Sequence, residues 1–386
     1  MAGDATAAGV REPSLRAALS FTECDDELCG TPVVLKASHI IARRMTVRLA
    51  KLQYTGCVRH VLLLKKWHDA ESAAVLQALE HFLRSEMPTL SLSVAVDGDS
   101  ADFDSVDLVV CVGGDGTVLH CASMCPGPMP PLMSVSAGGS LSFLTSFRSD
   151  DAPAVLRRLV LDTPVAPFFE VCAGGGGAAD CACLCADVCF QVSLRMRLRA
   201  RLFRAGCSVP EAEYSALNEV LLGRGSSPFL TQFDAAVDGV PLTKVQADGI
   251  IIATPTGSTA YNLSAGGPIC MPTVPAMLFT PVCPHSLSFR PLLLPDSSRV
   301  RLSIPAGSRG TAVMNADGKN QVELRCGDWL EVDMSDFPVP LVTNVSTSAD
   351  FVLGLTDKLH WNLREAQKPL LYCVGADHAP VISPSA

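Results

Sequence analysis

The chain has 386 residues, of which 48% are hydrophobic and 18% are charged, and it carries a net charge of −9. This length is sufficient for two domains with buried cores. The acidic balance argues against a nucleic-acid-binding protein, since such proteins neutralise phosphates with Lys and Arg. The sequence has no uninterrupted apolar run of about 18 residues, which argues against a membrane-spanning helix.

The cysteine content and the N-terminal segment bear on the cellular compartment. The chain has 16 cysteines, a lower density than in small disulfide-rich scaffolds, so we expect a reducing and therefore cytoplasmic environment. Residues 1–54 are predicted to form a variable, partly disordered extension that contains a helix-like stretch from Ile40 to Leu52. The first residues include Asp4 and Glu12 and lack the apolar core of a signal peptide, and a role in organelle targeting is left open.

Residues 55–164 alternate between apolar runs typical of strands and segments with helical periodicity. In chain order, the expected strands and helices are Val58–Leu64, Ala70–Glu86 (helix), Leu90–Val96, Val106–Val112, Pro130–Ser136 and Asp150–Leu161 (helix). This alternation predicts an α/β domain with a parallel sheet and right-handed crossovers. Ligands of such sheets bind at the carboxyl ends of the strands.

A glycine-rich turn with one carboxylate, GGDGT, follows the strand Val106–Val112. Gly113, Gly114 and Gly116 allow a ligand to approach the backbone closely, because they have no Cβ. We expect Thr117 to cap a following helix, whose free N–H groups would favour an anion. The pattern predicts a phosphate site that contains Asp115, and a purely structural strand-to-helix turn is the alternative.

Residues 165–345 lose the helical periodicity and predict a second, β-rich domain of sandwich type. Its short alternating runs include Phe168–Cys172, Ala186–Met196, Phe233–Val237 and Arg299–Ile304. Within it, the stretch from Gly174 to Cys189 is rich in glycine and cysteine. Cys181, Cys183 and Cys185 alternate along the chain, which is not the spacing of a tetrahedral zinc site, so a glycine-rich hairpin is the preferred interpretation.

Two further motifs of this domain offer polar groups next to apolar strands. Asn218 and Glu219 precede one such strand and, considered alone, fit a structural turn. The strand Ile250–Ala253 leads into Thr254–Tyr261, with the sequence TPTGSTAY. This loop combines small hydrogen-bonding side chains with an aromatic ring, which suits a polyhydroxylated or purine ligand.

Together these motifs resemble the NAD kinase family, in its eukaryotic form. The resemblance rests on GGDGT, the Asn218–Glu219 pair and DGIIIATPTGSTAY, supported by PHSLSFRP at residues 284–291 and LHWN at residues 359–362. GGDGT alone is also found in lipid kinases and phosphofructokinases. The resemblance implies a Rossmann-like first domain, a β-rich second domain, and a C-terminal segment, residues 346–386, with a helix that returns to the first domain. It also implies a homodimer or homotetramer.

The reaction implied by this resemblance transfers the γ-phosphoryl group of ATP to the 2′-hydroxyl of the adenosine ribose of NAD, which gives NADP. Mg²⁺ would arrive with ATP rather than in a protein site. Asp115 would accept the proton of the hydroxyl or help to position magnesium. A catalytically weak NAD-binding sensor and a lipid kinase are the alternatives. The residues implied to contact the nucleotides are Gly113, Gly114, Gly116, Thr117, Phe143, Asn218, Glu219, Asp248, Thr256, Thr259, Ala260 and Tyr261.

The chain departs from the family pattern in AGGSLSFLT, residues 137–145. Ser142 stands where the family has a glycine, and Gly138 stands where it has a leucine. If the glycine is needed for positive φ or for close approach of a ligand, Ser142 would reshape the rim of the NAD site. Nucleotide affinity or preference would then change, while the chemistry would not.

Overall fold

The computed structural model describes residues 58–96, 102–138, 141–160, 189–225, 230–308, 310–344 and 347–362. The predicted disorder in residues 1–54 and the cysteine-rich stretch before Cys189 lie outside these ranges. The helical prediction for Ile40–Leu52 is wrong at its end, where Lys51–Leu52 pairs with a strand instead. The structure also describes the backbone of the short strands β1 (Ser20–Cys24), β2 (Val33–Lys36), β3 (Lys51–Leu52), β9 (Phe168–Glu170), β24 (Tyr372–Val374) and β25 (Pro380–Ile382).

The first domain is built on a mixed sheet with the strand order β5-β4-β6-β7-β23-β10-β9, with β8 paired to β7. Strands β5, β4, β6 and β7 are parallel, as predicted. Its strands are β4 (His60–Lys65), β5 (Ser91–Val96), β6 (Leu108–Val112), β7 (Leu132–Ser136), β8 (Phe147–Arg148), β10 (Cys189–Arg195) and β23 (Val339–Thr343).

The predicted domain boundary at residues 165–345 needs a correction. It placed β10 and β23 in the β-rich domain, but β23 pairs with β7 and β10 pairs antiparallel with β23, so both extend the first sheet. These pairings join residues that are far apart in the sequence, and local periodicity does not encode them. The sheet is therefore not purely parallel.

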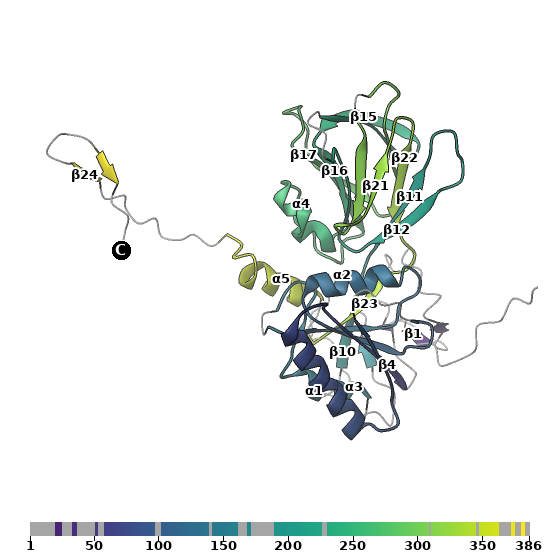
Figure 1. Cartoon of the computed structure of the whole chain (residues 1–386), viewed down its shortest axis with the longest axis vertical. Coiled ribbons are helices and arrows are strands. Elements are labelled where there is room, and N and C mark those ends of the chain that lie inside the picture. The colour runs from purple at the N-terminus through teal and green to yellow at the C-terminus, as the bar shows by residue number, and fades with distance from the viewer. Residues whose placement is uncertain are drawn as a thin grey trace, which may run out of the picture.

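Helices cover both faces of this sheet because alternate strand residues point to opposite sides. Helix α1 (Ala70–Glu86) is capped at its N-terminus by Asp69, whose carboxylate accepts a hydrogen bond from the Ser72 amide at 2.9 Å. With α3 (Ala152–Val160), α1 packs on the face that carries Val61 and Leu63. Helix α2 (Asp115–Met124) packs on the other face, on the side of the second domain (Figure 1).

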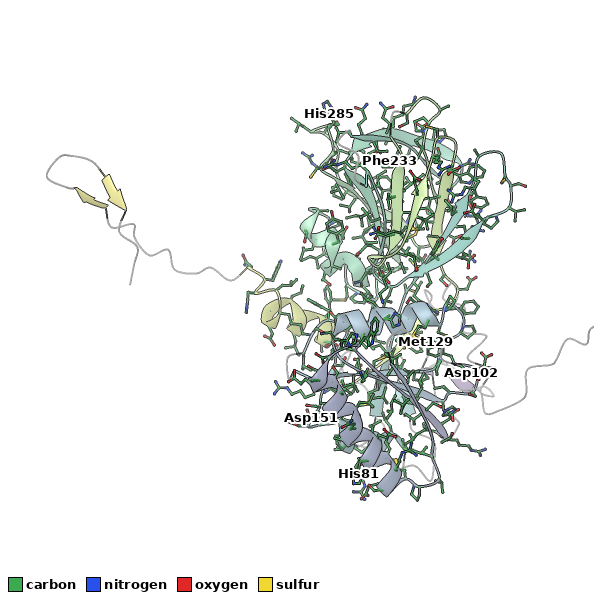
Figure 2. All side chains as sticks on the ribbon, in the orientation of Figure 1. His81, Asp102, Met129, Asp151, Phe233 and His285 are labelled. Carbon is green, nitrogen blue, oxygen red and sulfur yellow. The ribbon has the colours of Figure 1, made fainter. Side chains whose placement is uncertain are left out.

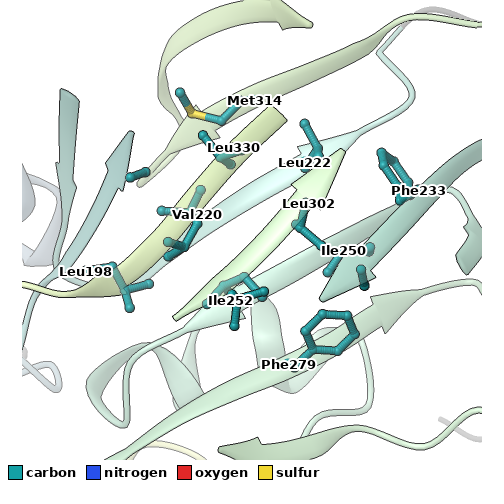
Figure 3. Packing of buried hydrophobic residues seen from close by; sticks show 14 of the residues in the cluster. Leu198, Val220, Leu222, Phe233, Ile250, Ile252, Phe279, Leu302, Met314 and Leu330 are labelled. Carbon is teal, nitrogen blue, oxygen red and sulfur yellow. The ribbon is translucent and has the colours of Figure 1, made fainter. Parts of the chain in front are cut away.

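The second domain is a sandwich of two antiparallel six-stranded sheets, as predicted. Leu222 and Ile250 from one sheet meet Phe233 and Leu302 from the other in a single core (Figure 3). One sheet contains β12 (Ala212–Ala216), β11 (Leu198–Phe203), β22 (Trp329–Met334), β19 (Val300–Ser303), β14 (Thr231–Val237) and β15 (Val240–Ala247). The other contains β18 (Leu292–Pro295), β17 (Ala276–Val282), β16 (Gly249–Ala253), β13 (Glu219–Gly223), β20 (Ala312–Ala316) and β21 (Lys319–Leu324).

The junction between the domains lies at α2 and at the two chain crossings, which follow β10 and precede β23 (Figure 1). Met129, after α2, is buried in the core on this side of the first sheet (Figure 2). Helix α5 (Thr347–Asp357) follows β23, and its residue Gly354 packs against Phe143 of the first domain. Two short helical turns, η3 (Thr256–Thr259) and α4 (Tyr261–Ser264), follow β16 on the junction side of the second domain.

Candidate active site

The GGDGT turn connects β6 to α2, and Gly113 is required at its first position. Gly113 has φ +156°, and a Cβ on it would lie 2.3 Å from the Thr117 hydroxyl oxygen. Helix α2 begins at Asp115 with Gly114 as its N-cap residue. The prediction that Thr117 caps the helix is therefore wrong: Thr117 lies in the first turn, where its buried hydroxyl packs against Gly113 without a hydrogen-bond partner.

Asp115 is held by the turn of residues 142–145. Its Oδ1 atom accepts hydrogen bonds from the Ser142 hydroxyl, the Leu144 amide at 3.0 Å and the Thr145 hydroxyl at 3.4 Å. The turn is closed by two backbone bonds of 3.3 Å that Ser142 and Thr145 exchange. The orientation of the carboxylate is thus fixed by a second loop on the same rim of the sheet.

Helix α5 packs on this turn. The Lys358 ammonium group, just after α5, donates to the Ser142 carbonyl at 2.7 Å and lies 5.2 Å from the centre of the Phe143 ring. A Cβ on Gly354 would lie 2.8 Å from that ring. Ser142 is not among the described non-glycine residues with positive φ. The backbone at this position therefore does not require the glycine that is typical of the family, and it accepts serine without strain.

A buried ion pair adds charge beside Asp115, and the sequence analysis missed it. Arg195 on β10 and Asp350 on α5 approach to 3.5 Å, with side-chain exposures of 4% and 17%. Burial lowers the pKa of Arg195 and raises the pKa of Asp350, and both groups sense the charge of Asp115. Because β10 was assigned to the other domain, no sequence signal linked Arg195 to this site.

The Asn218–Glu219 pair is anchored by a residue that the sequence analysis also missed. Asp317 accepts hydrogen bonds from the backbone amides of Leu217, Asn218 and Glu219 at 2.7, 2.8 and 3.0 Å. Burial raises the pKa of Asp317. The available signal was the Asp317-Gly318 dipeptide, which is typical of a tight hairpin turn and here connects β20 to β21.

The loop after β16 packs directly against Asn218. The Thr254 amide donates to the Asn218 carbonyl at 2.9 Å, and a Cβ on Gly257 would lie 2.1 Å from that same oxygen. Thr254 and Ser258 are fully buried, and their hydroxyls bond the carbonyls of Leu217 and Cys270. The interpretation of the loop as a row of donors for a ligand is therefore wrong for these hydroxyls, because the fold uses them.

The predicted contact residues of this loop differ in accessibility. Thr256 is 7% exposed, Thr259 and Ala260 are partly exposed, and Tyr261 is 41% exposed. The Tyr261 amide bonds the Glu219 carboxylate, whose Oε2 atom is buried without a partner. Asn218, Glu219 and this loop are thus brought together.

Asp248 lies apart from this cluster. It directly precedes β16, whereas Thr254 follows the end of the strand, so the two are roughly 20 Å apart along an extended chain. Asp248 forms an ion pair of 2.8 Å with Arg224, a partner that the sequence analysis did not identify. The structure does not bring Asp248 to Asp115.

The two halves of the site meet at the domain junction. Leu217, next to Asn218, packs in one core with Val118 of α2 and Leu144 of the turn that holds Asp115. Lys319 on β21 lies 2.7 Å from the Nδ1 atom of His120 on α2. These contacts place the Asn218–Glu219 pair beside the helix that begins with Asp115.

Family models match both halves of this site. The ATP-NAD kinase N-terminal domain matches residues 94–163, and the ATP-NAD kinase C-terminal domain matches residues 217–344. The chain belongs to the ATP-NAD kinase family. The structure of this family member also resembles that of yeast NADH kinase complexed with NADH, with a TM-score of 0.68 and 29% identity over 83% of this chain and 93% of the other.

Two curated plant relatives extend the similarity in sequence. NAD kinase 2, chloroplastic, of Arabidopsis thaliana is 40% identical over 70% of this chain and 26% of its own length. Probable NAD kinase 2, chloroplastic, of Oryza sativa subsp. japonica is 35% identical over 95% of this chain and 37% of its own length. The chain therefore spans well under half of the length of these two relatives.

Two features are absent from the part of this NAD kinase family member that the structure describes. None of its helices is long and apolar enough to cross a membrane. No three His, Cys, Asp or Glu side chains within the described ranges lie together as a possible set of metal ligands.

We expect alanine at Gly113 to destabilise the protein, because its Cβ would meet the Thr117 hydroxyl and its φ would be strained. The expected loss in the free energy of unfolding is about 1–3 kcal/mol, measured by urea denaturation. Gly116→Ala is the matched control in the same motif, since nothing lies within 4 Å of a Cβ there. Equal destabilisation by the two changes would contradict this account.

We expect Glu219 to make stability depend on pH. Burial, with the charge of Asp317 second, raises its pKa from 4.5 to about 7. Between pH 4.5 and about 7, the folded protein therefore binds more protons than the unfolded chain. This contributes up to about 3 kcal/mol to the free energy of unfolding below pH 4.5, and the contribution is lost as the pH rises through about 7.

The measurement is urea denaturation of wild type and Glu219→Gln between pH 4.5 and 8. The variant should lose less stability than wild type as pH rises, because its amide does not titrate. Glu213→Gln, at an exposed position of β12, is the control and should follow wild type. The explanation fails if Glu219→Gln and wild type give parallel curves.

Proposed function

We propose that this chain is an NAD kinase, which transfers the γ-phosphoryl group of ATP to the 2′-hydroxyl of the adenosine ribose of NAD. The observation that supports this best is the state of Asp115 at the start of α2. Its Oδ1 is held by the turn of residues 142–145, and its Oδ2 accepts no hydrogen bond from the described residues. One carboxylate oxygen therefore remains for a substrate hydroxyl beside Asn218 and Glu219.

The chemistry follows from positioning more than from a strong base. Phosphoryl transfer has a loose transition state, so the main requirement is to align the hydroxyl with the γ-phosphorus atom. Asp115 orients the hydroxyl and accepts its proton late, as the bond to phosphorus forms and the hydroxyl becomes more acidic. Mg²⁺ belongs to the ATP substrate, and the amides at the start of α2, from Gly114 to Gly116, favour phosphate oxygens.

The nucleotide contacts remain proposals by resemblance. Asn218 would meet the adenine edge, Glu219 the ribose, and Phe143 the adenine ring. Thr256, Thr259, Ala260 and Tyr261 would line the dinucleotide. Their support is that Glu219 and the loop after β16 are joined in the structure, and that Tyr261 exposes part of its ring.

We also propose a homodimer or homotetramer in the cytoplasm. An organelle is the alternative compartment, which the chloroplastic relatives support. Light scattering of the purified chain tests the assembly, and imaging of the full-length protein tests the compartment. No observation in the structure favours a weak NAD-binding sensor or a lipid kinase over the proposed activity.

Asp115→Asn should lower kcat for NADP formation by roughly 10²–10⁴-fold, because an amide cannot accept the proton. The assay contains purified protein, Mg-ATP and NAD or NADH, and calorimetry should show that NAD still binds. Asp150→Asn, an exposed carboxylate of the same domain, is the matched control and should keep the wild-type rate. A wild-type protein that forms no NADP would rule out the proposed function.

Asp248→Ala should weaken NAD binding by about 10-fold, which corresponds to about 1.4 kcal/mol, while kcat at saturating NAD changes less. The reason is that Asp248 lies a strand length from Asn218, so it would contact a remote part of the dinucleotide or a dinucleotide held by a second copy. Calorimetric titration with NAD is the measurement, and Glu213→Ala on the other sheet is the control. Unchanged affinity would remove Asp248 from the site.

A further inference from the structure

Ser142 has a contact with the proposed catalytic group that a glycine could not make. Its hydroxyl donates to Oδ1 of Asp115. We propose that Ser142 is a positioning residue for Asp115, which turns Oδ2 of the carboxylate toward the substrate hydroxyl. This inference rests on the proposed NAD kinase function, and it assigns a role to a position where the chain departs from the family pattern.

The first step of the argument is that the three donors converge on one oxygen. The Ser142 hydroxyl, the Leu144 amide and the Thr145 hydroxyl all bond Oδ1. A carboxylate with one oxygen bound in this way resists rotation about its side-chain bond, because rotation would break several hydrogen bonds together. The other oxygen is then presented in one direction.

The second step is that Ser142 itself is fixed from two sides. Its backbone exchanges hydrogen bonds with Thr145 inside the turn, and its carbonyl accepts from the Lys358 ammonium group at 2.7 Å. The neighbouring Phe143 packs against Gly354 of α5 and lies 6.5 Å from the ring of Phe351. The hydroxyl is therefore carried by a braced backbone, not by a mobile loop.

The third step concerns what remains without this hydroxyl. The Leu144 amide would still bond Oδ1 at 3.0 Å, but the Thr145 hydroxyl, at 3.4 Å, is a long and weak donor. The carboxylate would then sample more orientations, and fewer of them would align the substrate hydroxyl with the γ-phosphorus atom. Such a loss lowers kcat more than it lowers nucleotide binding.

The experiment compares Ser142→Ala, Ser142→Gly and Ser142→Thr in the NADP-formation assay. We expect the first two to lower kcat by about 10-fold with the KM values for NAD and ATP within about 2-fold, and threonine to restore kcat to within about 3-fold of wild type. In an Asp115→Asn background, Ser142→Ala should change the residual rate by less than about 2-fold, because the group that it positions is gone.

Ser146→Ala is the matched control. It removes a hydroxyl group that lies in the same segment but does not bond Asp115, so this variant should keep the wild-type rate. Thermal unfolding of each variant separates folding defects from catalytic ones. Unchanged or increased kcat in Ser142→Ala overturns the inference, as does a loss that threonine does not restore or that persists in the Asp115→Asn background. If the wild type forms no NADP, the proposed function fails. If the wild type is active and the Ser142 variants do not behave as expected, only the role of Ser142 fails.

Discussion

The hydrogen bonds of the Arg197 guanidinium are the interaction that holds the second domain in its position on the first. This guanidinium lies at the crossing from β10 to β11 and donates to the carbonyls of Ala122 and Cys125 on and just after α2, of Gly127 beyond them, and of Phe337 at the return crossing. Burial lowers its pKa to about 10, which still leaves it charged at neutral pH. Both crossings and the C-terminal end of α2 are therefore joined at one charged group, whose loss would leave several carbonyls without a donor.

The hydrogen bonds of Arg197 matter for the site because they fix one end of α2, the helix that carries Asp115 at its other end. Its C-terminal end is held by Arg197, its middle carries the contact between His120 and Lys319, and its first residue is Asp115. A helix fixed at its end and its middle presents its N-terminus in a defined direction. Asp317 holds the Asn218–Glu219 pair and lies in the hairpin turn that immediately precedes Lys319. The contact between Lys319 and His120 therefore connects both halves of the site, Asp115 through α2 and the Asn218–Glu219 pair through this hairpin.

Helices and strands that depend on local residue patterns could be predicted from the sequence. Contacts between segments far apart in the chain could not. The helix Ala70–Glu86 has the bounds that its sequence predicted, because its apolar residues recur every three or four positions. Membership of β10 in the first sheet could not be predicted, since its partner β23 lies about 150 residues later in the chain. Asp317 was missed for the same reason, because the amides that it binds lie 98 to 100 positions earlier.

The polar groups of the site divide into those that the fold uses and those that it leaves without partners. Thr254 and Ser258 are buried and fully bonded within the protein, so they shape the loop after β16. By contrast, the Thr117 hydroxyl and Oε2 of Glu219 are buried without a partner on the two sides of the domain junction. An unbonded buried polar group costs stability, and a ligand bound at the junction would supply a partner for these two groups. Sequence motifs identify both kinds of residue, but only the hydrogen bonds of the folded chain separate the groups that build the site from the groups available to a ligand.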